Sequence, residues 1–204
     1  MAPTPRLLIV MVEPAAPGCG KLPAVGFAIP AAPICSPYEA VLGEAFASLH
    51  AHVRRAHLAP LHAQGTMDVE HGRGWLVRTL VWLMKLPAAG LRQPVQLEVV
   101  ADGSELVWTR RIGRSILRTR QRASGSKLVE RSGPGRISFD LAVEGGALLY
   151  RQSSIHVAGL QVPPSLSPRV EAVVSATADG WHVAVTVTRC GQIVCRYQGI
   201  VRAS

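Results

Sequence analysis

The residues of this sequence that are best suited to chemistry are arginines and aromatic residues. A guanidinium group offers a planar fork of donors that fits a carboxylate or phosphate, and an aromatic ring supplies apolar contact area. The candidates of these types are Arg73, Trp75, Trp108, Arg110, Arg118, Arg120, Arg169 and Tyr197. They predict a binding site for a small apolar or amphipathic anionic ligand. Tryptophans of a core and arginines of a solvated surface would give the same residue types.

A pair of acids, Asp68 and Glu70, has the residue types of a general acid–base pair, because alternate residues of a strand project to one face. A simpler explanation is that the two acids are solvated on a surface strand or form ion pairs with Arg73 and Arg78. The sequence contains neither the G-x-S-x-G turn of a serine hydrolase nor the H-E-x-x-H helix of a zinc protease. We therefore favour a non-catalytic protein over an enzyme, and we assign no catalytic residues and no cofactor.

Four histidines lie close together in the sequence: His50, His52, His57 and His62. No carboxylate accompanies them, and two of them would point to nearly opposite sides of a helix, which favours solvated side chains over a metal site. The four cysteines lie in two distant pairs without C-x-x-C spacing. Residues 18–21 are rich in glycine but lack the spacing of a phosphate-binding loop. No metal site is expected.

The composition is that of a folded protein, with 48% hydrophobic and 17% charged residues among 204. The formal net charge of +9, carried mostly by arginine, favours anionic partners without naming one. No apolar run reaches the roughly 18–20 residues that span a bilayer, and the cysteine pattern indicates no disulfide framework. We interpret the chain as a cytoplasmic protein.

The chain divides into a leader, 1–37, and a single domain, 38–204. Eight prolines in the leader remove backbone donors and block helices, so we expect it to be largely irregular. Ser36 as N-cap, followed by a proline and Glu39, then predicts a helix from Tyr38. One apolar stripe runs along it for about four turns and consists of Leu42, Ala45, Phe46, Leu49 and Val53.

A second helix is predicted from Trp75 to Leu86, after a short strand around Met67 and Val69. It is apolar on nearly every side, so it must be buried on most sides or lie against another apolar surface. Pro87 ends it. We expect the rest of the domain to cover this helix.

From Val95 onward, short β-like segments alternate with turn signals. They are 95–101, 105–112, 115–122, 127–132, 136–144, 147–157, 169–177, 181–188 and 192–201. Tight turns without helical crossovers require antiparallel neighbours. The predicted fold class is therefore α+β: a large curved antiparallel sheet or partly closed barrel of about nine strands packed on one buried helix, with one further amphipathic N-terminal helix.

The chain resembles the bacterial domain-of-unknown-function family 4166. The residues that carry the resemblance begin with Gly65, Asp68-Val69-Glu70, Gly72-Arg73-Gly74-Trp75-Leu76, Leu86-Pro87, Gly90 and Pro94-Val95. They continue with Trp108-Thr109-Arg110, Gly113, Leu128, Glu130, Gly133-Pro134, Phe139, Leu141, Gly145-Gly146, Leu148, Gly159, Pro163, Leu166, Pro168-Arg169-Val170, Ala172, Gly180, Gly191, Ile193-Val194, Tyr197 and Gly199. The family pattern usually has phenylalanine at Ile112 and Pro-Leu at Arg189-Cys190.

The resemblance implies a domain type covering about Tyr38 to Val201 and no catalytic residues. It also implies frequent proximity to a saccharopine-dehydrogenase-like domain, which here would be a separate chain because no G-x-G-x-x-G follows a strand. Three functions remain open. The first is ligand binding in a pocket between sheet and helix. The second is an accessory or interaction role beside a dehydrogenase-like oxidoreductase. The third is non-specific binding of an anionic membrane or nucleic acid by the arginines between Arg110 and Arg122.

Overall fold

The computed structural model describes residues 36–204. The predicted irregular leader therefore lies outside the described residues, apart from its last two positions. Ser36 caps the first helix, and its hydroxyl accepts a hydrogen bond from the Tyr38 N–H over 3.3 Å. The Glu39 carboxylate in turn accepts from the Ser36 N–H, which completes a capping box.

Eleven strands form one antiparallel sheet within the described residues. They are β1 (Leu61–His71), β2 (Gly90–Asp102), β3 (Glu105–Ile112), β4 (Ser115–Ser124), β5 (Lys127–Ser132), β6 (Gly135–Glu144), β7 (Ala147–Val157), β8 (Leu160–Gln161), β9 (Arg169–Ala176), β10 (Trp181–Arg189) and β11 (Gln192–Ala203). Most strands pair with their neighbours in sequence, as tight turns require.

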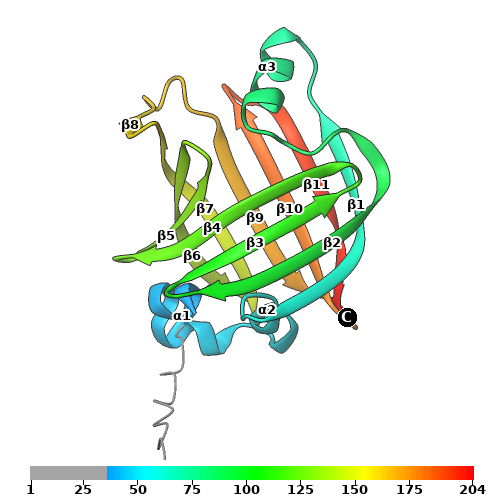
Figure 1. The fold of residues 1–204 in the computed structure, drawn as a ribbon, viewed down its shortest axis with the longest axis vertical. Coiled ribbons are helices and arrows are strands. Elements are labelled where there is room, and N and C mark those ends of the chain that lie inside the picture. The colour runs from blue at the N-terminus through cyan, green and yellow to red at the C-terminus, as the bar shows by residue number, and fades with distance from the viewer. Residues whose placement is uncertain (1–35) are drawn as a thin grey trace, which may run out of the picture. The chain divides into compact units, whose positions relative to one another are not determined.

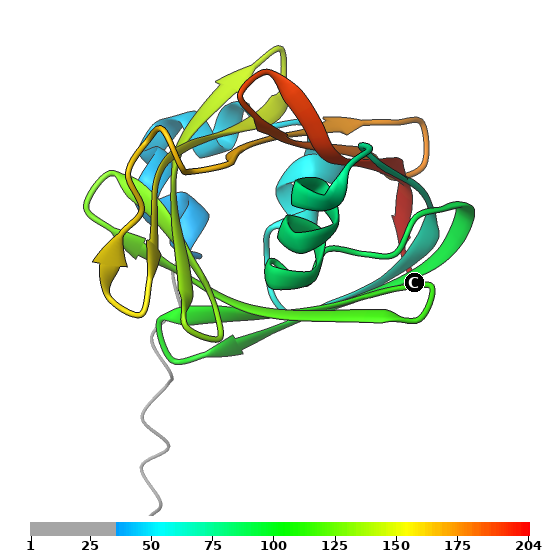
Figure 2. The ribbon, with the colours of Figure 1, turned by 90° about the horizontal axis from the view of Figure 1, so that it is seen from above.

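The sheet closes into a barrel of ten strands (Figures 1 and 2), with β8 outside it on the edge of β7. Closure comes from β1, which pairs with both β2 and β11, and from the pairing of β6 with β7. The predicted partly closed sheet of about nine strands was imprecise, and the fold is mostly β rather than α+β. Each of the ten barrel strands therefore has a paired strand on both sides.

The N-terminal helical layer lies over one end of the barrel (Figure 1) and consists of α1 (Pro37–Leu42), the 3-10 helix η1 (Gly43–Ser48) and α2 (Ala51–Ala56). The sequence predicted one continuous helix here, which was wrong. Gly43 ends α1 with a φ of 54°, and the His50 N–H donates to the Gly146 carbonyl in the β6–β7 turn instead of continuing the helix. The apolar stripe still faces the barrel, with Phe46, Leu49 and Val53 buried.

The helix α3 (Trp75–Leu83) lies over the opposite end (Figures 1 and 2). The prediction that this helix is buried inside the sheet was wrong. Its inner side contributes Val77 to the core, but Trp75 and Trp82 are 74% and 78% exposed. Helix α3 therefore covers part of the barrel mouth and is not enclosed by the barrel. None of the helices in residues 36–204 has the length and apolar character needed to cross a membrane.

Alternation along each strand fills the barrel interior. On β2, Val95, Leu97 and Val99 are buried, whereas the residues between them are exposed. Directly paired residues share a face, so the register of each neighbour extends this inner face around the barrel. The register therefore shows which polar side chains point inward.

Candidate functional site

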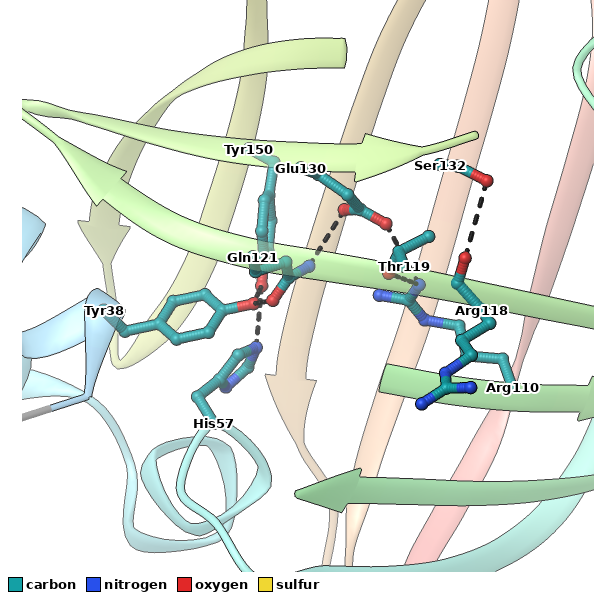
Figure 3. A network of polar contacts seen from close by, with 9 residues as sticks. All are labelled: Tyr38, His57, Arg110, Arg118, Thr119, Gln121, Glu130, Ser132 and Tyr150. Carbon is teal, nitrogen blue, oxygen red and sulfur yellow. Dashed lines mark hydrogen bonds and ion pairs between the residues drawn. The ribbon is translucent and has the colours of Figure 1, made fainter. Parts of the chain in front are cut away.

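An ion pair lies on the inner face of the barrel (Figure 3). Arg110 is paired in register with Leu97 and Leu117, and thus shares the inner face with the buried Leu97. Its Nη1 donates to Glu130 Oε1 over 3.1 Å and to Thr119 Oγ1 over 2.9 Å. The side chains of Arg110 and Glu130 are 22% and 18% exposed, so the interior around them is not fully packed.

Both members of this pair are charged at neutral pH. Burial by itself would raise the pKa of Glu130, but the Arg110 charge and hydrogen bonds from Gln121 and Thr119 lower it below its usual value. Burial would lower the pKa of Arg110, and the Glu130 carboxylate outweighs this and raises it. The barrel interior therefore contains a fixed cation whose charge is balanced by a neighbouring anion.

Several donors beside this pair lack a protein partner among the described residues. The Nε and Nη2 groups of Arg110 make no hydrogen bond there, and neither does the Tyr197 hydroxyl. The Trp108 Nε1 is buried without an acceptor. The guanidinium carbon of Arg110 lies 4.8 Å from the centroid of the Trp108 ring, which holds the arginine by a cation–π contact. Unused donors of this kind suit an anionic or polar acceptor group.

Tyr197 is a neutral donor in this arrangement. Burial raises the pKa of its phenol to about 12, and the nearby Arg110 charge opposes that rise without cancelling it. Apolar residues of the inner face also keep part of their surface accessible: Ile137, Ala172 and Val183. The polar donors therefore stand among apolar walls, which is the usual construction of a small-molecule site.

A second polar cluster ties the N-terminal helical layer to the barrel (Figure 3). The His57 Nδ1 lies 2.7 Å from the Val53 carbonyl, and a carbonyl can only accept, so Nδ1 carries a proton. Burial lowers the pKa of His57 to about 4, which leaves Nε2 unprotonated at neutral pH. The Tyr150 hydroxyl, 2.8 Å away, donates to it. Tyr38 donates to Gln121 Oε1 over 2.6 Å.

This second cluster contains no activated group. Burial raises the pKa of both Tyr38 and Tyr150 above the usual phenol value, so neither is a base or nucleophile near neutral pH. The prediction that His57 is a solvated histidine was wrong, because the end of α2 is packed against the barrel. Within the described chain, no group of three or more His, Cys, Asp or Glu side chains could hold a metal ion.

The structure brings together three of the eight residues proposed from the sequence: Trp108, Arg110 and Tyr197. The remaining five lie elsewhere. Arg73 and Trp75 are exposed at the barrel mouth. Arg118 and Arg120 point outward from β4, and Arg169 points outward from β9, where its Nε lies 2.9 Å from Glu171 Oε1. Whether the eight bind a ligand stays a prediction.

The sequence suggested that the arginine row on β4 has no acidic neighbours, but the structure places two acids beside it. Arg120 Nη1 lies 2.7 Å from Asp102 Oδ2 and 3.2 Å from Glu105 Oε2, and both acids come from the neighbouring hairpin. A shallow hollow beside them on the outer face is lined by Glu98, Asp102, Arg111 and Arg118, among others. This outer surface therefore has mixed charge and differs from the all-basic face that the sequence predicted.

Asp68 and Glu70, the pair of acids considered for acid–base chemistry, lie on β1, and Asp68 has a structural role there. Asp68 Oδ1 accepts a hydrogen bond from the Arg92 backbone N–H over 2.6 Å, which fixes the start of β2. Sequence reasoning missed the interior partners Thr119, Gln121 and Glu130. Their signal was present, because each occupies the inward phase of its strand, where a polar residue needs a buried partner.

A closed antiparallel barrel with a charged pair and unused donors in its interior thus defines the class of this protein. The chain belongs to the family Domain of unknown function (DUF4166), whose model matches residues 49–200. No curated protein matches the chain.

Two solved structures are similar in fold. A secretary abundant heat soluble (SAHS) protein from Ramazzottius varieornatus is 11% identical, with a TM-score of 0.41, over 72% of this chain and 95% of that one. The "REP1-NXSQ fatty acid transporter" is 12% identical, with a TM-score of 0.39, over 71% of this chain and 95% of that one.

Proposed function

We propose that this domain binds a small amphipathic molecule inside the barrel, with an anionic head group at Arg110 and an apolar part along the inner wall. The observation that carries the proposal is an inward-facing guanidinium with two unused donor groups, beside the Tyr197 hydroxyl and the Trp108 Nε1. Such donors are costly to leave unmatched in a low-dielectric interior, so an acceptor from a ligand would be favoured there.

The position of Glu130 makes this site selective. It accepts from Arg110 and from Gln121, so both carboxylate oxygens are engaged within the protein. The negative charge of Glu130 would repel a bound anion. The anion is therefore limited to an orientation in which it meets the Nε and Nη2 edge of the Arg110 guanidinium, away from Glu130. A monovalent head group with a slim apolar tail fits this demand better than a multiply charged phosphate.

Binding is favoured over catalysis because no group that the structure describes near Arg110 is prepared for proton transfer at neutral pH. The three interior tyrosines have raised pKa values, and the unprotonated nitrogen of His57 already accepts a hydrogen bond from Tyr150. Positioned, uncommitted acids or bases are what general acid–base chemistry requires. The accessory role beside a dehydrogenase-like partner remains an alternative, for which recovery of an oxidoreductase in a pull-down from the native host is the test.

Calorimetric titration with dodecanoate and with dodecan-1-ol tests the head-group requirement, because the two differ only in the charged end. We expect the carboxylate to bind about 10- to 100-fold more tightly than the alcohol, since a charge-assisted hydrogen bond contributes roughly 1.5–3 kcal/mol. The double variant Arg110→Gln, Glu130→Gln removes both charges without leaving one unpaired. It should bind both probes equally weakly.

The matched control is the double variant Arg169→Gln, Glu171→Gln, which removes an equivalent ion pair from the outer face. It should bind dodecanoate like the wild type. Lipid extraction from the purified protein, followed by mass spectrometry, would then show which amphipathic molecules it carries. If the interior double variant keeps full affinity for dodecanoate, Arg110 is not the head-group site and the proposal fails.

A further inference from the structure

The outer side of α3 forms an apolar surface at the barrel mouth that no described part of the chain covers. Its exposed members, called here the mouth patch, are Trp75, Leu76, Trp82 and Leu83. Trp75 and Trp82 are seven residues apart and thus lie about two turns apart on the same side of the helix. Two tryptophans on this surface have about three quarters of their area exposed to water. Exposed apolar patches of this kind mark sites of contact with another molecule or a membrane.

The inner side of α3 is already in use, so the helix does not need to turn over to bury its apolar residues. Val77 is buried, and Leu80, Val81 and Met84 pack against the core. The outer tryptophans therefore remain exposed while the barrel stays intact. The mouth patch is a property of the folded domain.

Cations accompany the mouth patch in the sequence. From His71 to Leu97 the chain has four basic residues and no acid: Arg73, Arg78, Lys85 and Arg92. All four are exposed, and none of their side chains has an ion pair or hydrogen bond in residues 36–204. The acids that flank this stretch in sequence are Glu70 on β1 and Glu98 on β2. Asp68, also on β1, accepts a hydrogen bond from the Arg92 N–H.

The opposite end of the barrel has a different charge pattern. Two of the acids there are paired with cations: Glu144 with Arg151 over 3.5 Å and Asp179 with Arg202 over 2.8 Å. The stretch around α3 differs from this in containing cations without any acid. This asymmetry would orient the mouth patch toward an anionic surface.

We propose that the mouth patch docks on an anionic lipid bilayer, with the two tryptophans at the level of the head groups and the four cations against the lipid charges. Tryptophan prefers the membrane interface because its ring is apolar and its N–H is polar. Short amphipathic helices lie in this plane without crossing the bilayer. The combination of exposed tryptophans with unpaired cations distinguishes this occupant from an apolar protein groove, which would not need the charges.

Vesicle binding by the full chain tests this proposal. We expect it to co-sediment with phosphatidylcholine vesicles that contain about one third phosphatidylserine, and far less with phosphatidylcholine alone. Tryptophan emission should shift to the blue on binding, and added salt should weaken binding. Buried Trp108 and Trp181 should contribute little to that shift.

Two double variants separate the apolar and charged contributions. Trp75→Ala with Trp82→Ala should weaken binding by about tenfold or more and abolish the blue shift. Arg78→Gln with Lys85→Gln should weaken binding to the anionic vesicles about tenfold or more, because each cation near such a surface contributes roughly a factor of five. The matched control, Arg54→Gln with Arg55→Gln on α2, removes the same charge at the other end and should bind within about twofold of wild type.

Three outcomes would overturn the proposal: no binding of wild type to anionic vesicles, an equal loss in the α2 control, or a blue tryptophan emission that vesicles do not change. Sedimentation velocity, which measures the oligomeric state, tests a fourth outcome. If the tryptophan variant dissociates a dimer and wild type ignores vesicles, the mouth patch is an interface between copies. The Arg110→Gln, Glu130→Gln variant should still bind vesicles, so this proposal and the ligand-binding proposal can fail separately.

Discussion

The two ends of the barrel are both covered by short helices, but these helices differ in what they bury. At the α1–α2 end, Tyr38 and Val53 are fully buried and hydrogen bonds connect the helical layer to β4 and β7. At the α3 end, two tryptophans of a more apolar helix stay exposed. Apolar composition alone therefore does not identify the helix that closes a barrel, because inward packing also needs polar partners for the groups it buries.

The largest expected difference between the two ends lies in stability. Tyr38→Ala should lower the free energy of unfolding by about 3–5 kcal/mol, because it leaves a cavity and removes the partner of Gln121. Trp82→Ala should change it by about 0.5 kcal/mol or less, since the ring is mostly exposed. Urea denaturation measures both. Equal losses of unfolding free energy would mean that α3 is packed into its end of the barrel as tightly as α1 is, and would contradict the difference between the two ends.

A smaller effect should appear in the pH dependence of the free energy of unfolding, and it comes from His57 at the α1–α2 end. Burial lowers the pKa of His57 to about 4, below its ordinary 6.5, so between these values the unfolded chain binds a proton that the folded chain does not. The stabilisation is complete above about pH 6.5 and is lost as the pH falls toward 4. Its loss amounts to roughly 3 kcal/mol.

His57→Gln tests this by removing the titrating group. Unfolding of the variant, measured by denaturant at several pH values, should lack this part of the acid destabilisation. His52→Gln on the outer side of α2 should retain the wild-type slope. If the His57 variant and wild type lose stability in parallel, the imidazole is not responsible.

The ion pair between the two ends should give the smallest of these effects. Glu130→Gln leaves Arg110 without its carboxylate and should cost about 2 kcal/mol, less than a fully buried pair because both side chains retain some exposure. Adding Arg110→Gln should restore part of that loss. Thermal unfolding of the single and double variants gives the comparison, and a double variant less stable than the single one would contradict it.

Much of the barrel could be predicted from the sequence because strand alternation and tight turns are local. The predicted bounds of β3, β5 and β7 agree with the structure, and those of β4, β6, β9, β10 and β11 differ by one or two residues. Strand β2 begins at Gly90 and not at Val95, and β1 is longer than the short strand expected around Met67 and Val69. The two-residue strand β8 gave no periodic signal, and neither did the break between η1 and α2, which depends on a hydrogen bond from His50 to the distant Gly146.

The candidate site was only partly predictable for a similar reason. Residue type alone selected Trp108, Arg110 and Tyr197, which the structure places on one interior surface. The same residue types also selected Arg118 and Arg169, which point outward. Whether an arginine points into the barrel or outward depends on the pairing register of its strand. A shift of one residue in that register moves every side chain of the strand to the other face of the sheet.

By itself, the sequence determined the strands, their turns, the helix start at Ser36 and the excess of positive charge, because each follows from the residues within one segment. Only the tertiary structure decided that the sheet closes, that Glu130 meets Arg110 and that α3 lies over the barrel mouth with its tryptophans exposed. These outcomes depend on contacts between segments far apart in the chain, whose geometry is fixed by barrel closure and not by local preference.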